Sequence, residues 1–418
     1  MTIDSGIAQA QARRQVVLEK SSSLRASLPL RFFRQQAHYT TPASSYRLAH
    51  SAATRGFEPA FKIFAKYEIS LEDLANTLAA PLSAVKAFAQ SNPRAPLVML
   101  DGEDAQALEE TVVLTGRQNA IDIFRQADWG STLRFYRPSG LQLPYCVEDI
   151  IRVLTEAGAG RPPQAFPIDG IIFPKLEHGG EIDWVCGVLD EIEANLGLAQ
   201  NQIKLQFLVE SGWSVMNLPD LVSRSVPRLA GIIFGIADYT ADLGLPKIRY
   251  DHPLCDWSRA AVVNSAGAAG VPAIDAMTVN YPVADPALSA KDNKQQILFR
   301  LKECYQDALH SIDLGMNGKW VGHPAQLFVV LLAYHLHHTS GAIQAEVDKI
   351  RAYQASVDEK VGATIIGGVM SDRATDRHAR ARLRQAVALG QLPLEEGLAL
   401  GIVSNAEAAS MDERTQDE

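Results

Sequence analysis

Short apolar runs alternate with amphipathic stretches through the middle of the chain, a pattern that predicts strands alternating with helices. The clearest pair is Ile203–Val209 and Leu229–Phe234, two apolar runs separated by a helical stretch. Glu210 directly follows the first run, and Asp238 follows the second beyond a glycine. Two parallel strands joined by a helix form a βαβ unit, whose chemistry lies beyond the carboxyl ends of its strands. We therefore expect both carboxylates at the same edge of a sheet.

Similar apolar runs recur along the chain, near residues 38, 98, 133, 171, 206, 232, 274 and 321. Eight strands separated mostly by helices are what an α/β fold of the (β/α)8 TIM barrel type needs. The expected organisation is an N-terminal helical extension at 1–35, a catalytic barrel at 36–330 with an insertion at about 57–92, and a C-terminal helical lid or oligomerisation segment at 331–418.

Local signals predict several elements in more detail. Ser70 lies three positions before Asp73, which resembles a capping box at the start of a helix in the insertion. Ala105–Gln126 is expected to be helical, and Gly318–Gln326 is expected to be the last strand. Gly362–Asp372 is a glycine-rich interruption in an otherwise helical C-terminal pattern.

The composition narrows the class of protein. With 47% hydrophobic and 21% charged residues, the chain is expected to fold into a globular protein. The net charge of −9 argues against a nucleic-acid partner. Residues 1–30 lack the apolar core of a signal peptide, and no apolar run is long enough to span a membrane. The four cysteines have neither zinc-site nor disulfide spacing, so a reduced cytoplasmic compartment fits best.

Acidic residues at the ends of the expected strands are the first candidates for chemistry. Glu210 and Asp238 would converge on one point, and carboxylate oxygens are ligands that Mg²⁺ prefers. The alternative is that both acids cap helices. A second cluster, Asp101, Glu103 and Asp104, follows another apolar run. These acids repel one another unless a cation lies near, so they form a solvated loop, orient an arginine or bind metal-bound water.

Basic residues and a histidine lie at other strand ends. Arg134 and Arg137 share one expected strand, and a guanidinium can bind a carboxylate through two hydrogen bonds. Because side chains alternate along a strand, only one of the two can point into a site, and a surface ion pair is the alternative for either. Lys175 is expected to pair with an acid rather than to form a Schiff base. For His323, a structural role and an active-site role both remain open.

Eight motifs follow one another over residues 37–380: TTPASSYR, MLDGEDA, LRFYR, DGIIFPKLE, FLVESGWSVMN, IIFGIADYTADLG, GKWVGHPAQ and GGVMSD. In this order they resemble the HpcH/HpaI aldolase/citrate lyase β-subunit family, which includes malyl-CoA and citramalyl-CoA lyases. Three positions depart from the family pattern. Gly102 replaces a leucine, Gly322 replaces an aliphatic residue, and Gly367 stands where the pattern has an acid.

The resemblance implies roles for the candidate residues. It implies that Glu210 and Asp238 bind Mg²⁺, with Mn²⁺ as an alternative ion, and that Arg134 or Arg137 binds a substrate carboxylate. It also implies that Asp372 is a catalytic acid or base supplied by the tail of a neighbouring subunit. The further substrate-binding residues that it suggests are Glu103, Asp104, Lys175, Gly235, Ala237, His323 and Pro324.

The activity implied is Mg²⁺-dependent cleavage or formation of a 3-hydroxyacyl-CoA, such as malyl-, methylmalyl- or citramalyl-CoA. The products would be an acyl-CoA and glyoxylate or pyruvate. Three alternatives stay open: a malyl-CoA thioesterase, a CoA-independent aldolase for hydroxy-keto acids, and a non-catalytic subunit of a complex. The expected partners are a small keto acid and an acyl-CoA, with no nucleic acid and no membrane. A shared site requires an oligomer, and the family suggests a homotrimer or homohexamer.

Overall fold

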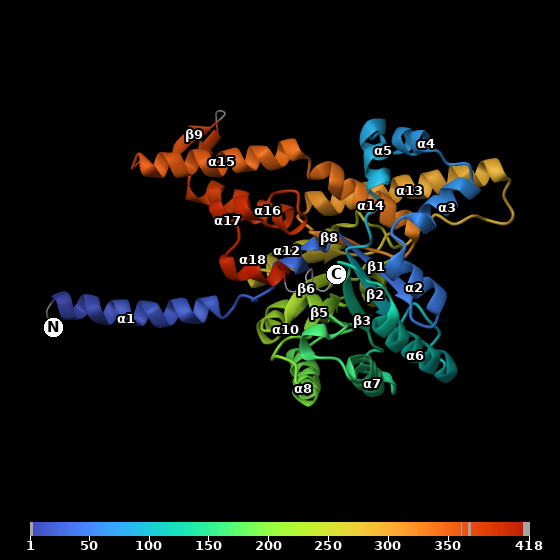
Figure 1. Cartoon of the computed structure of the whole chain (residues 1–418), viewed down its shortest axis with the longest axis horizontal. Coiled ribbons are helices and arrows are strands. Elements are labelled where there is room, and N and C mark those ends of the chain that lie inside the picture. The colour runs from blue at the N-terminus through green and yellow to red at the C-terminus, as the bar shows by residue number, and fades with distance from the viewer. Residues whose placement is uncertain (1–2, 361, 367–368, 413–418) are drawn as a thin grey trace.

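Eight parallel strands close into a barrel in the computed structural model, which describes residues 3–360, 362–366 and 369–412 (Figure 1). Each strand pairs with the next, and the last pairs with the first. The predicted (β/α)8 TIM barrel is therefore confirmed. The strands are β1 (Ala37–Pro42), β2 (Leu97–Asp101), β3 (Leu133–Arg137), β4 (Gly170–Phe173), β5 (Lys204–Val209), β6 (Leu229–Phe234), β7 (Ala273–Asp275) and β8 (Gly318–Val321).

Helices surround this barrel, because each buries an apolar face against the strands and leaves a polar face to solvent. One of them, α14, differs from a typical outer helix, since ten consecutive residues from Ala325 to Tyr334 are buried. The surrounding helices are α2 (Tyr46–Thr54), α6 (Glu110–Gln126), α7 (Cys146–Gly158), α8 (Gly179–Leu196), α9 (Gly212–Met216), α10 (Leu218–Ser225), α11 (Ile236–Asp242), α12 (Pro253–Ala269), α13 (Ala290–Asp313) and α14 (Pro324–His337).

The insertion between α2 and β2 explains the burial of α14. It forms three helices, α3 (Glu58–Lys66), α4 (Leu71–Leu78) and α5 (Leu82–Ser91). The predicted capping box is present, since the Ser70 hydroxyl accepts the Asp73 N–H at 3.0 Å and the Asp73 carboxylate accepts the Ser70 N–H at 2.8 Å. Helices α3 and α5 pack on α14. At this contact, the ring of Phe328 meets those of Phe57, Phe61, Phe64 and Phe88.

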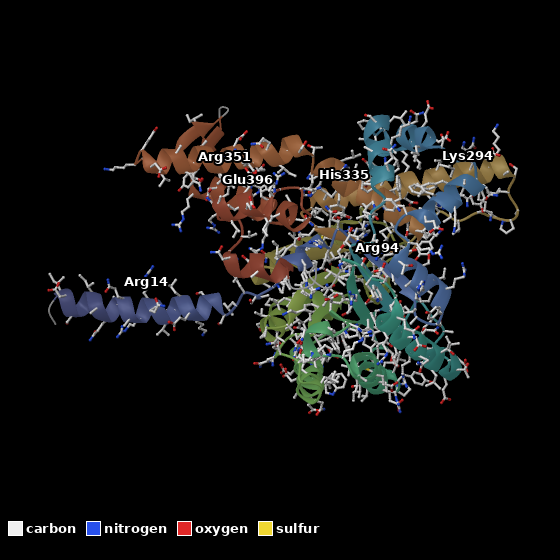
Figure 2. All side chains as sticks on the ribbon, in the orientation of Figure 1. Arg14, Arg94, Lys294, His335, Arg351 and Glu396 are labelled. Atoms are coloured by element: carbon white, nitrogen blue, oxygen red, sulfur yellow. The ribbon has the colours of Figure 1, made fainter. Side chains whose placement is uncertain are left out.

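The N-terminal segment begins with α1 (Ile3–Ser22), a helix that projects away from the rest of the molecule (Figure 1). Figure 2 shows Arg14 on this helix, far from the barrel. A short 3-10 helix, η1 (Leu30–Arg34), then leads into β1. Leu30 of η1 is fully buried, so the chain is anchored at this point.

The C-terminal segment packs on η1 and forms a second hydrophobic core with it. Arg34 donates to the backbone carbonyl of Ala388 at 2.7 Å, and Gln385 donates to the carbonyl of Asn317, just before β8, at 3.0 Å. These contacts lie at the amino ends of the strands. The segment therefore packs on its own barrel at the end opposite to the carboxyl ends of the strands. Its elements are α15 (Ser340–Asp358), β9 (Thr364–Ile366), β10 (Val369–Ser371), α16 (Arg373–Ala388), α17 (Leu394–Ala399) and α18 (Asn405–Asp412).

An antiparallel hairpin, β9–β10, lies within the stretch that the sequence marks only as a glycine-rich interruption. Gly367 lies outside the described residues, so the structure says nothing about that departure from the family pattern. Arg351 of α15 and Glu396 of α17 form an ion pair at 2.6 Å that ties the two helices together (Figure 2). Among the described residues, no helix is both long and apolar enough to cross a membrane.

Two predicted element boundaries are wrong for local reasons. Strand β8 ends at Val321, because His323 caps α14 through a 3.3 Å hydrogen bond that its Nδ1 accepts from the Ala325 N–H. Helix α6 begins at Glu110 rather than at residue 105. The Asp101 carboxylate accepts the N–H groups of Glu103 and Ala105, at 2.9 and 3.0 Å, and holds this stretch as a loop.

The aromatic cluster at Phe328 leads to a stability prediction. Phe328→Ala should lower the free energy of unfolding by about 3–5 kcal/mol, because it opens a cavity among rings that cannot collapse onto it. Phe299→Ala is the matched control, since Phe299 is 62% exposed, and should change stability by less than about 0.5 kcal/mol. Urea denaturation of both variants measures the difference. Equal stabilities would show that the insertion is not held through this cluster.

Candidate active site

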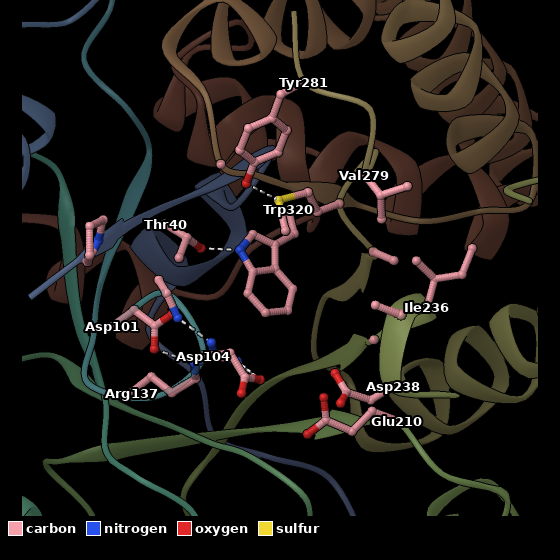
Figure 3. Close-up of a pocket in the computed structure, with 17 residues that line it drawn as sticks. Thr40, Asp101, Asp104, Arg137, Glu210, Ile236, Asp238, Val279, Tyr281 and Trp320 are labelled. Atoms are coloured by element: carbon pink, nitrogen blue, oxygen red, sulfur yellow. Dashed lines mark hydrogen bonds and ion pairs between the residues drawn. The ribbon is translucent and has the colours of Figure 1, made fainter. Parts of the chain in front are cut away.

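A cavity of about 350 Å³ lies at the carboxyl ends of the barrel strands (Figure 3). Active sites of TIM barrels lie at this face, because the loops that follow the strands meet there. The lining residues come from the ends of β1–β3 and β5–β8: Thr40, Pro42, Asp101, Asp104, Ala105, Arg137, Glu210, Gly235, Ile236, Ala237, Asp238, Ala276, Met277, Val279, Tyr281, Trp320 and Gly322.

Glu210 directly follows β5 and is only 4% exposed. Gln206, four positions earlier on β5, points into the barrel and donates to Gln35 at 2.7 Å. Side chains an even number of positions apart along a strand lie on the same face, so Glu210 also points inward. The backbone N–H of Lys175 donates to Glu210 Oε1 at 2.7 Å. Lys175 adopts a φ of 54°, a left-handed conformation that turns this N–H toward the carboxylate. A Cβ on Gly235 would lie 2.8 Å from Glu210 Cβ, so a glycine is needed there.

Asp238 faces the same cavity from the first turn of α11. The chain becomes helical at Ile236, immediately after Gly235, so Asp238 lies on a helix. Figure 3 shows the carboxylates of Glu210 and Asp238 side by side. Burial, with the negative charge of Asp238 adding to it, raises the pKa of Glu210 to about 8. The two carboxylates therefore form one electrostatically strained pair.

This pair fits a hard divalent cation. A buried carboxylate beside a second carboxylate lacks the positive charge that would stabilise its ionised form. Mg²⁺ is commonly held by one or two carboxylates, with water and substrate oxygens completing its octahedron. Over the described ranges, no group of three or more His, Cys, Asp or Glu side chains surrounds one metal position. An ion held by Glu210 and Asp238 would thus keep several positions for ligand oxygens.

Arg137 is the arginine that the structure places in the cavity. It is buried at the end of β3 and forms a two-bonded ion pair with Asp101, in which Nε and Nη2 each lie 2.6 Å from a carboxylate oxygen. Its Nη1 lies 3.3 Å from Glu103. It also lies 3.8 Å from Asp104, so a ligand carboxylate would have to share Nη1 with these two acids.

Arg134 does not line the cavity. It lies near the beginning of β3, where its guanidinium is 5.9 Å from the ring of Trp129, and its backbone pairs with Asp169 at the start of β4. The register explains the difference between the two arginines. An odd separation along a strand places Arg134 and Arg137 on opposite faces, so only Arg137 belongs to the site.

Glu103, Asp104 and Lys175 form an ionic cluster beside Arg137. Lys175 Nζ lies 2.7 Å from Glu103 and 3.3 Å from Asp104, which agrees with the expected ion pair. Burial raises the pKa of Glu103 to about 7, with the charge of Asp104 adding to the effect. Burial is the largest single effect and disfavours the charged Lys175 ammonium, but the hydrogen bond to Glu103 and the charges of Glu103, Asp104 and Glu210 together raise the pKa of Lys175. Only Asp104 of the three lines the cavity.

His323 and Pro324, the cap and the first residue of α14, directly follow Gly322 but do not line the cavity themselves. Burial lowers the pKa of His323 to about 4, and its Nδ1 is engaged as a helix cap. Gly235 and Ala237, in contrast, line the cavity directly. The histidine-rich stretch Tyr334–His338 (YHLHH) forms the end of α14 and its C-cap; Tyr334 is buried, and the ring centre of His335 lies 4.9 Å from that of Phe88.

Asp372 does not line the cavity of its own chain. It caps α16, where its carboxylate accepts the N–H groups of Ala374 and Thr375 at 2.9 and 3.1 Å. The hydrogen bond from Thr375 is the largest effect and lowers the pKa of Asp372. Its helix runs about 24 Å to Ala388, which contacts η1 at the opposite face of the barrel. Within one chain, Asp372 is therefore separated from Glu210.

The wall that includes Trp320, Tyr281 and Met277 is absent from the sequence-based site. Trp320 belongs to β8, and the other two belong to the loop after β7. Residues that follow a barrel strand are expected to border the site. This rule alone would have identified Met277 and Tyr281, although nothing in their residue types marks them.

The sequence of this chain is similar to a family model and to several named proteins. The family model described as "Domain of unknown function (DUF6986)" matches residues 147–415. The L-malyl-CoA/beta-methylmalyl-CoA lyase of Rhodobacter capsulatus is 28% identical over 309 residues, which cover 70% of this chain and 87% of that protein. The same enzyme name belongs to a relative from Haloarcula marismortui, 26% identical over 61% of this chain and 68% of its own length. These relatives confirm the resemblance to the citrate lyase β-subunit family.

Solved structures agree on the fold. A citrate lyase from Burkholderia xenovorans has a TM-score of 0.59 and 18% identity, and covers 90% of this chain and 97% of its own. The CitE protein of Mycobacterium tuberculosis, solved with magnesium, acetoacetate and coenzyme A, has a TM-score of 0.51 and 19% identity. It covers 84% of this chain and 98% of its own. At these identities the likeness supports the barrel architecture.

The Glu210–Asp238 pair predicts a pH-dependent stability. The folded metal-free protein keeps a proton on Glu210 up to about pH 8, whereas the unfolded chain releases it near the ordinary value of 4.5. The free energy of unfolding therefore falls as pH rises from about 4.5 to about 8, and above this range the full cost of ionising the buried Glu210 is present. Glu210→Gln removes the cost and should raise Tm by about 2–5 °C at about pH 9 and much less at about pH 5. Calorimetry in EDTA measures both shifts.

The exposed Glu191 on α8 provides the matched control. Glu191→Gln should leave Tm within about 1 °C of the wild type at both pH values. A Glu210→Gln shift of equal size at both pH values would contradict the assignment of a buried, proton-holding carboxylate.

Proposed function

The chain belongs to the DUF6986 family, and we propose that it is a Mg²⁺-dependent carbon–carbon lyase acting on 3-hydroxyacyl-CoA thioesters. It would cleave malyl-, methylmalyl- or citramalyl-CoA into an acyl-CoA and glyoxylate or pyruvate, or run the reverse condensation. The observation that carries this proposal is the buried Glu210 beside Asp238 at the barrel's carboxyl end, next to Arg137. Relatives named as malyl-CoA lyases support the substrate class.

The residues that line or border the cavity would have different roles in such a reaction. Glu210 and Asp238 would hold the divalent ion, which supplies Lewis-acid polarisation of the keto-acid oxygen when bound. Mn²⁺ is the alternative ion. The Nη1 side of Arg137 would bind the substrate carboxylate, and Asp101 keeps the guanidinium in place through its two hydrogen bonds. Lys175 positions Glu210 through its backbone N–H.

The bond changes in the cleavage direction are those of a retro-aldol reaction. The substrate hydroxyl would give its proton to a carboxylate base, proposed to be Asp372 of a neighbouring subunit, and become the carbonyl of the released glyoxylate or pyruvate. The bond between the hydroxyl-bearing carbon and the acyl α-carbon breaks, and its electrons form a thioester enolate. A proton is then delivered to the α-carbon to give the acyl-CoA.

Asp372 of a neighbouring subunit is proposed to move that proton. Its place at the tip of the C-terminal segment, away from its own cavity, suits a role in a neighbouring site. The β9–β10 hairpin just before it exposes Ile365 and Met370, which are 75% and 63% exposed and face each other across the hairpin. Exposed apolar side chains of this size favour contact with another protein surface. A homotrimer or homohexamer would supply that surface.

An activity assay tests the proposed reaction. Malyl-, methylmalyl- and citramalyl-CoA, and their product pairs, are incubated with Mg²⁺ or Mn²⁺ and with EDTA, and CoA esters and keto acids are separated by chromatography. At least one substrate should turn over only with metal. Glu210→Gln should lose more than about 100-fold in rate, since outer-shell changes alone cost 10–100-fold. Glu191→Gln should keep the wild-type rate.

Two results would contradict this reaction. If no substrate turned over with either ion, the lyase proposal would fail. If malyl-CoA gave malate and free CoA without glyoxylate, the protein would be a thioesterase.

Mixing inactive variants tests the shared site. Glu210→Gln and Asp372→Ala subunits are co-expressed with different tags, and doubly tagged oligomers are purified. If each site combines one barrel with a neighbour's tail, doubly tagged trimers should recover about a third of the wild-type activity, and doubly tagged hexamers about a quarter. Oligomers that remain inactive would place Asp372 outside its neighbour's site. Light scattering of the same samples gives the oligomeric state.

A further inference from the structure

Gly322 and Tyr281 form a matched pair in the cavity wall. A Cβ on Gly322 would overlap the Tyr281 hydroxyl and lie 2.7 Å from the sulfur of Met277. The phenol therefore occupies the space where any larger residue at position 322 would place its side chain. This fits the departure at Gly322, since the family pattern has an aliphatic residue there.

Tyr281 reaches this space from the loop that follows β7. Its hydroxyl donates to Met277 Sδ at 2.9 Å, and its ring lies 6.0 Å from that of His323. A thioether is a weak acceptor, so packing rather than hydrogen bonding holds the ring. Burial raises the pKa of Tyr281, and the charge of Asp101 adds to this, so the residue remains a neutral phenol.

Trp320 provides a rigid surface beside Tyr281. Its indole N–H donates to the Thr40 hydroxyl, and the Arg137 guanidinium lies 5.2 Å from the centre of its ring. The side chain is only 8% exposed. Because Thr40 binds the indole N–H and Arg137 lies over the ring, the Trp320 side chain is held in one orientation and does not make room for a bulky ligand.

The cavity consequently has two halves of different chemistry. Figure 3 shows Glu210 and Asp238 on one side and Tyr281 on the other, with the indole of Trp320 between them. Met277 and Val279 extend the apolar side. A charged group is best placed near the carboxylate pair and its ion, whereas a hydrocarbon group gains free energy by leaving water against the apolar wall.

We infer that Tyr281 is a specificity-determining residue that limits the size of the hydrocarbon substituent on the substrate's acyl group. Gly322 makes this possible by giving the phenol its place. The inference rests on the proposed lyase function and adds a residue role: Tyr281, seated against Gly322, sets the upper limit on the acyl group just beyond the acetyl and propionyl groups of malyl- and methylmalyl-CoA.

The test measures acyl-chain preference in the condensation direction with glyoxylate. For the wild type, kcat/KM should be higher with acetyl-CoA or propionyl-CoA than with butyryl-CoA. Tyr281→Ala should raise the butyryl-to-acetyl ratio by about tenfold or more, because one methylene in an apolar pocket is worth 10–200-fold. Tyr281→Phe keeps the ring and should leave the ratio within about twofold. Tyr353→Ala, on α15 outside the cavity, is the matched control.

A valine at position 322 would occupy the space that the Tyr281 phenol fills, which gives a second test. Gly322→Val alone should lower Tm, because the new side chain collides with the phenol. In the Tyr281→Ala background the same substitution should cost much less, and the double variant should return toward the wild-type preference for short chains. This coupling in Tm is measured without any turnover.

The outcomes separate the two proposals. If the wild type is active but Tyr281→Ala leaves the ratio unchanged, the inference is wrong and the lyase function stands. If Tm effects of Gly322→Val are equal in both backgrounds, the matched pair is wrong. If the wild type condenses no acyl-CoA while the Tm coupling is present, the packing is right, but the lyase function fails and the specificity role fails with it.

Discussion

The burial of Glu210 beside a second carboxylate is the constraint on which the rest of the site depends. Ionising a group that is cut off from water and faces Asp238 is costly, as the raised pKa of Glu210 shows. Two backbone features hold the carboxylate in this place nonetheless. The Lys175 N–H donates to it, and Gly235 leaves room for it. The closed barrel supplies the rigidity, since adjacent strands β5 and β6 determine where the two acids meet.

Much of this arrangement could be predicted from the sequence because it depends on local patterns. Glu210 and Asp238 follow apolar runs that end abruptly, and a parallel barrel brings such ends together whatever the details of packing. The strand around Arg134 and Arg137 was equally clear, but the pattern could not say which arginine faces inward. That choice depends on the register of β3, which the neighbouring strands determine.

Other features depend on contacts between distant residues and were not predictable in this way. Tyr281 belongs to the cavity because Gly322 leaves space for it, and Trp320 because Thr40 and Arg137 hold it. Neither of these contacts between distant residues is marked by a periodic pattern in the sequence. The C-terminal helices likewise pack their apolar faces with Leu30 at the amino ends of the strands, a contact between residues that are far apart in the sequence.

Gly102 and Gly322, two of the three glycines that depart from the family motifs, share a physical explanation. A Cβ on Gly102 would lie 2.7 Å from the hydroxyl of Tyr136, just as a Cβ on Gly322 would overlap that of Tyr281. In both places a tyrosine from a neighbouring part of the barrel fills the space that a larger residue would take. Tyr136 is fully buried, whereas Tyr281 borders the cavity. Cores keep their density through such exchanges of volume.

The packing of the C-terminal helices on η1 sets an order of events during synthesis. The surface that receives α16 is built by Leu30 and Arg34 together with Asn317, which precedes the last barrel strand. That surface is complete only after β8 has closed the barrel against β1. Since the tail also leaves the ribosome last, it docks on a finished barrel. The β9–β10 hairpin, which directly precedes α16, therefore reaches its place only on a chain whose barrel has closed.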